Sequence, residues 1–184
     1  MNNNIIGTAS VANSGNDQGS GIGLDLSGTG THTALVTNNQ IRRYGNTGIQ
    51  VNAGASGITT AGGMQLTFTG NTITEPENSG GAVANGIHVN SGTNSGNAFE
   101  VCVDIKTNSI AASGNNVNIG EEDFRVRQRQ STTVRLPGYA GSATDDAAVV
   151  SFIQGQNTGA ETGSASHSVG FTGGAACTQP TVPN

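Results

Sequence analysis

Apolar and polar residues alternate over short stretches of the chain, and one five-residue pattern of this kind occurs three times. The pattern is Gly, Ile, any residue, Leu or Val, and then Asp or Asn, and its copies begin at Gly21, Gly48 and Gly86. The two apolar residues of each copy lie two positions apart, so in a strand both point to the same face. Glycine before them and Asn or Asp after them are typical of turns. Each copy is therefore predicted to form one short strand and a corner.

A second motif lies between these copies and consists of alternating apolar residues followed by Asn, any residue and Ile. It occupies residues 35–41, 66–73 and 101–110, and its asparagines are Asn39, Asn71 and Asn108. A partial copy lies at residues 3–5. Polar, Gly-rich insertions of unequal length separate the copies. The strands are thus predicted to repeat while the loops between them differ.

Short strands with one or two inward apolar residues bury a core only when they stack in parallel, coil upon coil. This requirement predicts an all-β protein, a right-handed parallel β-helix or β-solenoid, with a short C-terminal capping α-helix. Asn39, Asn71 and Asn108 would then form an internal ladder of side-chain amides at the strand spacing of ~4.8 Å. A β-sandwich is the competing architecture, but it predicts hairpin turns and not the return of one pentapeptide.

The alternation of Gly-Ile-x-Val-Asn with Gly-Asn-Thr-Ile resembles the parallel β-helix repeats of pectate-lyase-like folds and of large bacterial surface proteins. The resemblance covers roughly residues 3–136. It implies a secreted or surface-anchored bacterial protein, located outside the cell or on its surface. It is not specific for function, because lyases, glycosidases, phage tailspikes and adhesins share this architecture.

The chain is predicted to have three parts, namely coils in residues 1–136, a turn and capping helix in 137–157, and a Gly/Ser/Thr-rich tail in 158–184. Ser142 or Thr144 can cap the helix, and Val149 and Ile153 belong to its apolar face. Such a helix covers the open end of a solenoid. Because no comparable cap precedes the first coil, we expect upstream coils of the same parent protein, and self-association through the uncapped N-terminal end.

The composition of the chain limits the classes of partner that it can bind. Only 33% of residues are apolar and 10% are charged, with 29 glycines, so the periodicity is what distinguishes the chain from a disordered segment. The net charge of -5 disfavours nucleic acid, because phosphate binding depends on Lys and Arg. No apolar run approaches the roughly 20 residues that cross a bilayer, and the first residues lack the features of a signal peptide. We therefore expect a piece of a larger exported protein, with neither nucleic-acid binding nor membrane insertion.

The two cysteines, Cys102 and Cys177, leave two alternatives open. They form one disulfide in an oxidising compartment, or they are two buried thiols. The bond would close a loop of about 75 residues and contribute on the order of 4 kcal/mol. The tail is correspondingly consistent with a linker or with an irregular strap that Cys177 pins.

Candidate chemistry is sparse in the outward positions of the repeats. His88 occupies such a position, with Gln50 at the matching position of the preceding copy, but a single surface histidine is usually solvated. No carboxylates recur at one outward position, as glycoside hydrolysis would require. Acidic residues at 121–123 and 145–146 match no calcium loop or calcium repeat. No catalytic residue, metal site or cofactor is therefore predicted.

Arg125, Arg127 and Arg129 alternate, so in a strand all three project from one face. Together with His88 they are the candidate binding residues, for an anionic glycan or for a host or cell surface. The acidic residues at 121–123 could instead pair with them in a surface ion-pair ladder. The sequence predicts a non-catalytic structural or adhesion segment of a large secreted or surface-anchored bacterial protein. A polysaccharide-binding or polysaccharide-cleaving module, similar to a lyase or hydrolase, is the alternative, and ice binding by threonines in 67–74 is a third.

Overall fold

The computed structural model describes residues 1–16, 18–77, 85–114 and 122–181. These residues form mostly β-strands, as the all-β prediction expects, with one short helix, α1 (Asp146–Gln156). The strands are β1 (Ile5–Ile6), β2 (Ile22–Leu26), β3 (Thr31–Thr37), β4 (Gln40–Ile41), β5 (Thr47–Ala53), β6 (Gly63–Thr69), β7 (Thr72–Ile73), β8 (Asn85–Ser91), β9 (Glu100–Lys106), β10 (Phe124–Gln128), β11 (Thr133–Arg135), β12 (Gly163–Ser166) and β13 (Phe171–Thr172). Within the described residues, no helix is long and apolar enough to cross a membrane.

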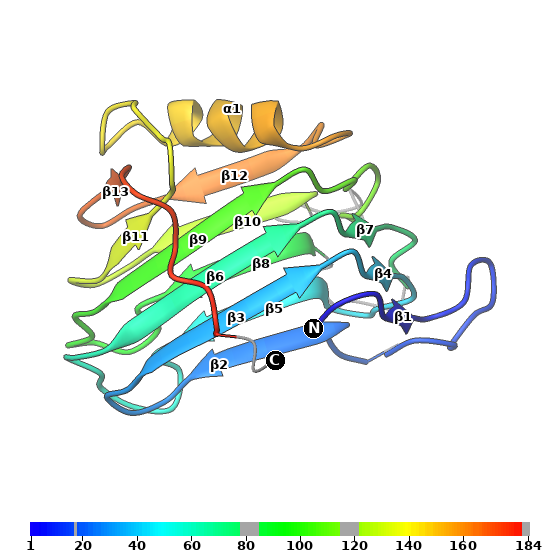
Figure 1. Cartoon of the computed structure of the whole chain (residues 1–184), viewed down its shortest axis with the longest axis horizontal. Coiled ribbons are helices and arrows are strands. Elements are labelled where there is room, and N and C mark those ends of the chain that lie inside the picture. The colour runs from blue at the N-terminus through cyan, green and yellow to red at the C-terminus, as the bar shows by residue number, and fades with distance from the viewer. Residues whose placement is uncertain (17, 78–84, 115–121, 182–184) are drawn as a thin grey trace.

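The strands build three parallel sheets. Sheet 1 has the order β12-β10-β8-β5-β2, sheet 2 the order β13-β11-β9-β6-β3, and sheet 3 the order β1-β4-β7. The chain visits sheets 1, 2 and 3 in turn, and each strand pairs in parallel with the strands of the preceding and following passes. Figure 1 shows the passes stacked from β2 toward β12, with α1 lying across the far end. The Gly-Ile pentapeptides all fall in sheet 1.

The pentapeptides align in register, and their apolar residues form the core side of sheet 1. Ile22, Ile49 and Ile87 are neighbours on β2, β5 and β8, and Phe124 on β10 continues their column. A second column runs through Leu24, Val51, Val89 and Val126. All of these side chains are buried except Leu24, which is partly buried. The predicted inward positions are therefore correct.

A ladder of asparagines lies at the corner between sheets 2 and 3. Asn39 Nδ2 donates to Asn71 Oδ1 at 2.9 Å, and Asn71 Nδ2 donates to Asn108 Oδ1 at 2.9 Å. Asn4 extends the ladder at one end and Asn157 at the other. The ladder that the repeated asparagines predict is present and includes two further members. A residue with positive φ precedes each of four members, namely Asn3, Asn38, Gly70 and Thr107.

The helix differs from its prediction at its N-terminal end. Asp145, and not Ser142 or Thr144, is the N-cap, and its side chain accepts a hydrogen bond from Ala148 N at 2.9 Å. Val149 and Ile153 are buried against the core, as predicted. The C-cap is Asn157, whose Nδ2 donates to Ile153 O at 2.8 Å. Because Asn157 is also the last ladder member, the same side chain fixes the helix end to the stacked corners.

The predicted tail contains two more strands. β12 pairs with β10, and β13 pairs with β11, so both large sheets continue beyond residue 136 and beyond the helix. Residues 163–166 escaped prediction because their sequence, Gly-Ser-Ala-Ser, has almost no apolar content. Gly163 follows Phe124 in the inward column, and a Cβ at Gly163 would clash with the ring of Phe124. The large Phe124 side chain therefore takes the space that a larger residue at Gly163 would need.

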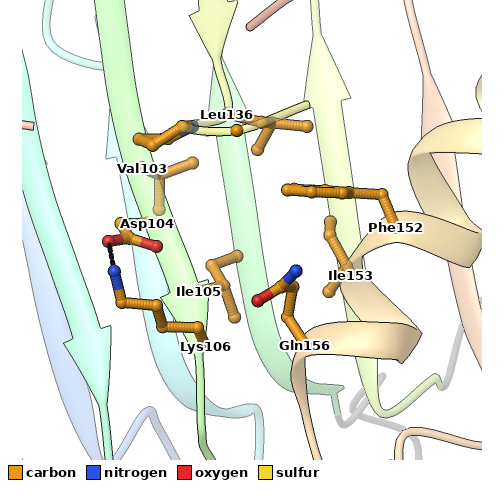
Figure 2. Close-up of a pocket in the computed structure, with 10 residues that line it drawn as sticks. Val103, Asp104, Ile105, Lys106, Leu136, Phe152, Ile153 and Gln156 are labelled. Atoms are coloured by element: carbon orange, nitrogen blue, oxygen red, sulfur yellow. Dashed lines mark hydrogen bonds and ion pairs between the residues drawn. The ribbon is translucent and has the colours of Figure 1, made fainter. Parts of the chain in front are cut away.

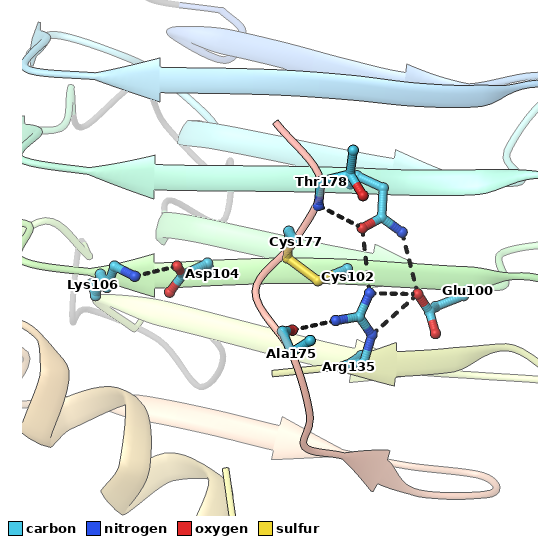
Figure 3. Close-up of a disulfide and its surroundings, with 9 residues drawn as sticks. Glu100, Cys102, Asp104, Lys106, Arg135, Ala175, Cys177 and Thr178 are labelled. Carbon is cyan, nitrogen blue, oxygen red and sulfur yellow. Dashed lines mark hydrogen bonds and ion pairs between the residues drawn. A yellow bond between two sulfur atoms is a disulfide. The ribbon is translucent and has the colours of Figure 1, made fainter. Parts of the chain in front are cut away.

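The remaining residues, 173–181, form an irregular segment that we call the strap. It leaves β13 and runs back across the outward face of sheet 2 (Figures 1 and 3). A disulfide joins Cys177 of the strap to Cys102 of β9, with the two Cα atoms 5.6 Å apart. Of the two cysteine alternatives the structure therefore contains the bridge, and of the two tail alternatives the strap.

Candidate functional site

The outward face of sheet 1 carries two columns of polar positions. The first column runs through Gly23, Gln50, His88, Arg125 and Ser164. The second runs through Asp25, Asn52, Asn90, Arg127 and Ser166. Arg129 follows directly after β10. The predicted binding residues, which are distant in sequence, thus come together on and beside the neighbouring strands β8 and β10.

A polar hollow of about 350 Å³ lies on this face. Its lining includes the amides of Asn46, Gln50, Asn52 and Asn85, together with His88 and Arg125. Amides provide both donors and acceptors, and the guanidinium of Arg125 provides donors only. The hollow is therefore suited to a polar ligand that carries hydroxyl groups as well as a negative charge.

Hydrogen bonds hold Gln50 in the hollow. Its Oε1 accepts from Thr47 Oγ1 at 3.0 Å, and its Nε2 donates to Asn52 Oδ1 at 3.0 Å. Gln50 Nε2 also lies 3.4 Å from His88 Nδ1. The side chain is fixed at both ends, so the hollow is largely organised before any ligand binds.

Other polar atoms on the same face are buried and have no hydrogen-bond partner within the described parts of the chain. They are His88 Nε2, Asn90 Oδ1, Arg127 Nε and Ser164 Oγ. An unpaired buried polar group costs roughly 1–3 kcal/mol. A ligand or water that supplied both donors and acceptors would recover part of this cost, which favours binding at these two columns.

The electrostatics of the face are dominated by the arginines. Burial, followed by the charges of Arg125, Arg127 and Arg129, lowers the pKa of His88 from 6.5 to about 4. Burial, followed by the charges of Arg129 and Arg125, also lowers the pKa of Arg127. His88 is consequently neutral near neutral pH, and the positive charge of the face comes from guanidinium groups.

The predicted ion-pair ladder is not formed by the acidic residues that the structure describes. None of Arg125, Arg127 and Arg129 has an ion-pair partner among these residues. Asp123 is buried at the corner before β10, where its carboxylate accepts backbone N–H groups. Glu121 lies outside the described residues. No described carboxylate therefore competes with a ligand for these three arginines.

Arg135, the next arginine along the chain, belongs to another face. It lies on β11 in sheet 2, and its Nη2 is 3.0 Å from Glu100 Oε1. The outward columns of sheet 1 therefore contain Arg125 and Arg127 but not Arg135.

The depressed pKa of His88 predicts a pH dependence of stability. Between about pH 6.5 and pH 4 the unfolded chain binds a proton at this histidine that the folded chain does not, so stability falls as the pH falls through this range. Glutamine at position 88 cannot titrate. Between about pH 7 and pH 4.5 we therefore expect the free energy of unfolding of His88→Gln to fall by about 2–3 kcal/mol less than that of the wild type. Urea unfolding of both proteins at the two pH values measures this difference. Equal losses in the two proteins would contradict the depressed pKa.

A second cavity, of about 210 Å³, lies between β9 and α1 (Figure 2). Val103, Ile105, Leu136, Phe152 and Ile153 contribute apolar walls, and Asp104 and Lys106 pair with each other beside them. β11 ends at Arg135, so on this side the second half of β9 faces the helix side chains and not another strand, while its other side pairs with β6. The polar groups here satisfy each other, which makes the outward face of sheet 1 the better candidate site.

The sequence pattern missed part of this site. The pattern predicts a turn at the Asp or Asn that ends each pentapeptide, whereas Asp25, Asn52 and Asn90 lie within β2, β5 and β8 and form the second outward column. The period-2 alternation that places His88 outward applies equally to these residues and could have identified them.

The described residues contain no cluster of three or more His, Cys, Asp or Glu side chains that could hold a metal ion. Comparisons of the chain with protein-family models, with curated proteins and with solved structures each give no match.

Proposed function

We propose that the three sheets are the faces of a right-handed parallel β-helix, and that the chain is a rigid, non-catalytic segment of a large secreted or surface-anchored bacterial protein. Several features support this proposal. The passes follow one another in constant register, the asparagine ladder joins their corners, and a disulfide joins the tail to β9. Stacked repeats of this kind form stiff, extended scaffolds.

We also propose that the outward face of sheet 1 binds an anionic glycan and gives the segment an adhesive role. The observation that carries this proposal is the group of three arginines without described ion-pair partners beside a polar hollow. Guanidinium groups bind carboxylates and sulfates by paired hydrogen bonds. Outward positions recur every ~4.8 Å from strand to strand, so an extended polymer along the stacking direction would meet a polar side chain on each strand.

The two columns give this binding face a direction. Asp25 stands on β2, amides occupy β5 and β8, and Arg125 and Arg127 stand on β10. An anionic group is therefore expected at β10 and the neutral hydroxyls of the same glycan at the amides, because Asp25 would repel a second anion.

The edge strands β2 and β3 support the proposed contact with upstream coils of the parent protein or with a second copy. Each is the terminal strand of its sheet. Edge strands present unpaired N–H and C=O groups, although residues 1–3 already bond to Leu35 and Thr37 of β3. Leu24, Ala34 and Leu35 line a hollow of about 540 Å³ there. Further strands would cover both features.

Glycan binding is tested on an array of neutral, carboxylated and sulfated glycans. We expect binding to anionic glycans that Arg127→Ala weakens by about tenfold or more, because a hydrogen bond to a charged group contributes roughly 1.5–3 kcal/mol. Arg42→Ala is the matched control, because Arg42 lies beyond β4 and faces Glu75, so its loss removes the same charge from another part of the surface. It should leave binding unchanged.

The same samples test the non-catalytic part of the proposal when polysaccharide chain length is followed over time. Cleavage that His88→Ala abolishes would contradict it and favour the lyase-like or hydrolase-like alternative. Equal weakening by Arg127→Ala and Arg42→Ala would show attraction to net charge and not a site. Absence of all glycan binding would leave a structural segment without the adhesive role.

A further inference from the structure

The strap follows a single column of outward positions in sheet 2. The column runs through Thr33, Gln65, Cys102, Arg135 and Thr172. After Thr172 the strap turns back and crosses the strands toward β3, on the face opposite to the core (Figure 3). It therefore lies along the stacking direction and not along the strands.

The strap contacts three successive strands of sheet 2 and reaches a hollow beside a fourth. Arg135 Nη1 on β11 donates to Ala175 O, and Cys102 on β9 is bonded to Cys177. Thr178 N donates to Gln65 Oε1 on β6 at 3.1 Å. Pro180 lines the hollow beside Thr33 on β3. One covalent bond and a few weaker contacts thus connect the passes from outside.

The side chains beneath the strap are held by one another. Arg135 Nη2 donates to Glu100 Oε1 at 3.0 Å and to Gln65 Oε1 at 3.3 Å, and Gln65 Nε2 donates to Glu100 Oε1 at 3.2 Å. The hydrogen bond from Arg135 is the largest of the effects that lower the pKa of Glu100. These three side chains keep most of their hydrogen bonds when the strap is removed.

The disulfide is the principal attachment of the strap. Within residues 173–181, Cys177 is buried and the other side chains are intermediate or exposed. The strap belongs to no strand, so it lacks the ladder of hydrogen bonds that holds β13. Segments with few buried contacts open at low free energy. The strap therefore has little to hold it once the covalent bond is broken.

Sheet 2, in contrast, has its own attachments. β3 pairs with β6, and β6 with β9, along the whole length of each strand. Cys102 occupies the outward column, and the core side of β9 is formed by Val101, Val103 and Ile105. Neither these pairings nor this core includes the disulfide.

We infer that the Cys102–Cys177 disulfide is a redox-controlled clasp that opens the strap without unfolding the sheets. Because Cys102 and Cys177 are both buried in the closed form, the strap first opens locally. A thiolate of an external dithiol then attacks one sulfur, the S–S bond breaks, and the second thiol of the dithiol resolves the mixed disulfide. Two electrons and two protons pass to Cys102 and Cys177, which become thiols, and the dithiol becomes a disulfide. The open form exposes the outward column with Gln65 and Arg135. This inference does not depend on the proposed glycan site, which lies on sheet 1.

Hydrogen exchange of the full chain, with and without dithiothreitol, tests the clasp. On reduction we expect exchange of the Thr178 amide, which donates to Gln65 Oε1 in the closed form, to rise by about tenfold or more, while exchange in β6 and β9 and the far-ultraviolet circular dichroism stay unchanged. Cys177→Ser should reproduce this pattern without reductant, and Cys102 should become accessible to iodoacetamide. Arg135→Ala, with the disulfide intact, should leave the strap protected.

Two results would overturn the inference. Unchanged protection of the strap after complete reduction would show that the weaker contacts are sufficient to hold it. A simultaneous loss of protection in β6, β9 and the strap, or failure of Cys177→Ser to fold, would show that the disulfide stabilises the whole fold and is not a local clasp.

Discussion

Replacement of Asp123 by alanine is expected to lower the free energy of unfolding by about 3–5 kcal/mol, because it removes a carboxylate that accepts two buried and two part-buried backbone N–H groups. Asp123 is 1% exposed. Its Oδ1 accepts from Ser113 N at 2.9 Å and Gly114 N at 3.3 Å. Its Oδ2 accepts from Glu161 N at 3.1 Å and Thr162 N at 3.0 Å. One carboxylate thus joins the corner before β10 to the loop after β9 and to the segment that leads into β12.

Asp123→Asn separates the hydrogen bonds of this carboxylate from its volume. The amide has almost the same size, but its NH₂ group would face backbone N–H donors, so we expect more than half of the loss seen with alanine. Asp25→Asn is the matched control, because Asp25 is exposed on the outward face of the same sheet. It should change stability by no more than about 0.5 kcal/mol. Urea unfolding followed by circular dichroism measures all three, and a small loss in Asp123→Asn would show that the carboxylate contributes mainly by packing.

The parts of the fold that the sequence predicts are those encoded by a local period. Ile49 and Val51 lie two positions apart, and this spacing alone places them on the core side of β5. The repeated asparagines predict their ladder for a similar reason, because each follows an apolar alternation at the same distance from the next isoleucine. In both cases the information lies within a few residues of the side chain concerned.

Connections between distant segments leave no such local pattern. Gln128 is an example, since its Oε1 accepts from Ser168 N, Val169 N and Gly170 N at 2.8, 2.7 and 3.0 Å. Asp123 is another example. Its position among the acidic residues 121–123 indicates a surface side chain, but in the structure Asp123 is buried. β12 belongs to the same class. Gly163 has no side chain because the ring of Phe124, a residue distant in sequence, occupies the space that a side chain would need.

The candidate site shows the same division. Alternation correctly predicts that Arg125 and Arg127 share one face of a strand. That His88 stands beside Arg125 depends on the register between β8 and β10, and the insertion that separates these strands hides this register in the sequence. The pairing of Cys102 with Cys177 likewise follows from the path of the strap, which has no periodic signal.

Replacement of Asn71 by alanine is the second change from which we expect a loss of about 3–5 kcal/mol, because a single substitution breaks several buried hydrogen bonds. Asn71 Oδ1 accepts from Asn39 Nδ2 at 2.9 Å and from Asn39 N at 3.0 Å. Its Nδ2 donates to Asn108 Oδ1 and to Val36 O, both at 2.9 Å. The partners are all buried, so water cannot easily replace the lost amide.

Asn71→Leu and Asn4→Ala identify the origin of this loss. Leucine fills the cavity that alanine leaves but restores no hydrogen bond, so it should be about as unstable as alanine. Asn4 is exposed at the end of the ladder, where its Nδ2 donates to Asn39 Oδ1 at 2.8 Å, and its replacement should cost only about 1 kcal/mol. Thermal and urea unfolding of the three variants gives the comparison. If leucine restored wild-type stability, the ladder would act through packing, and the amide hydrogen bonds would contribute little to holding the corners in register.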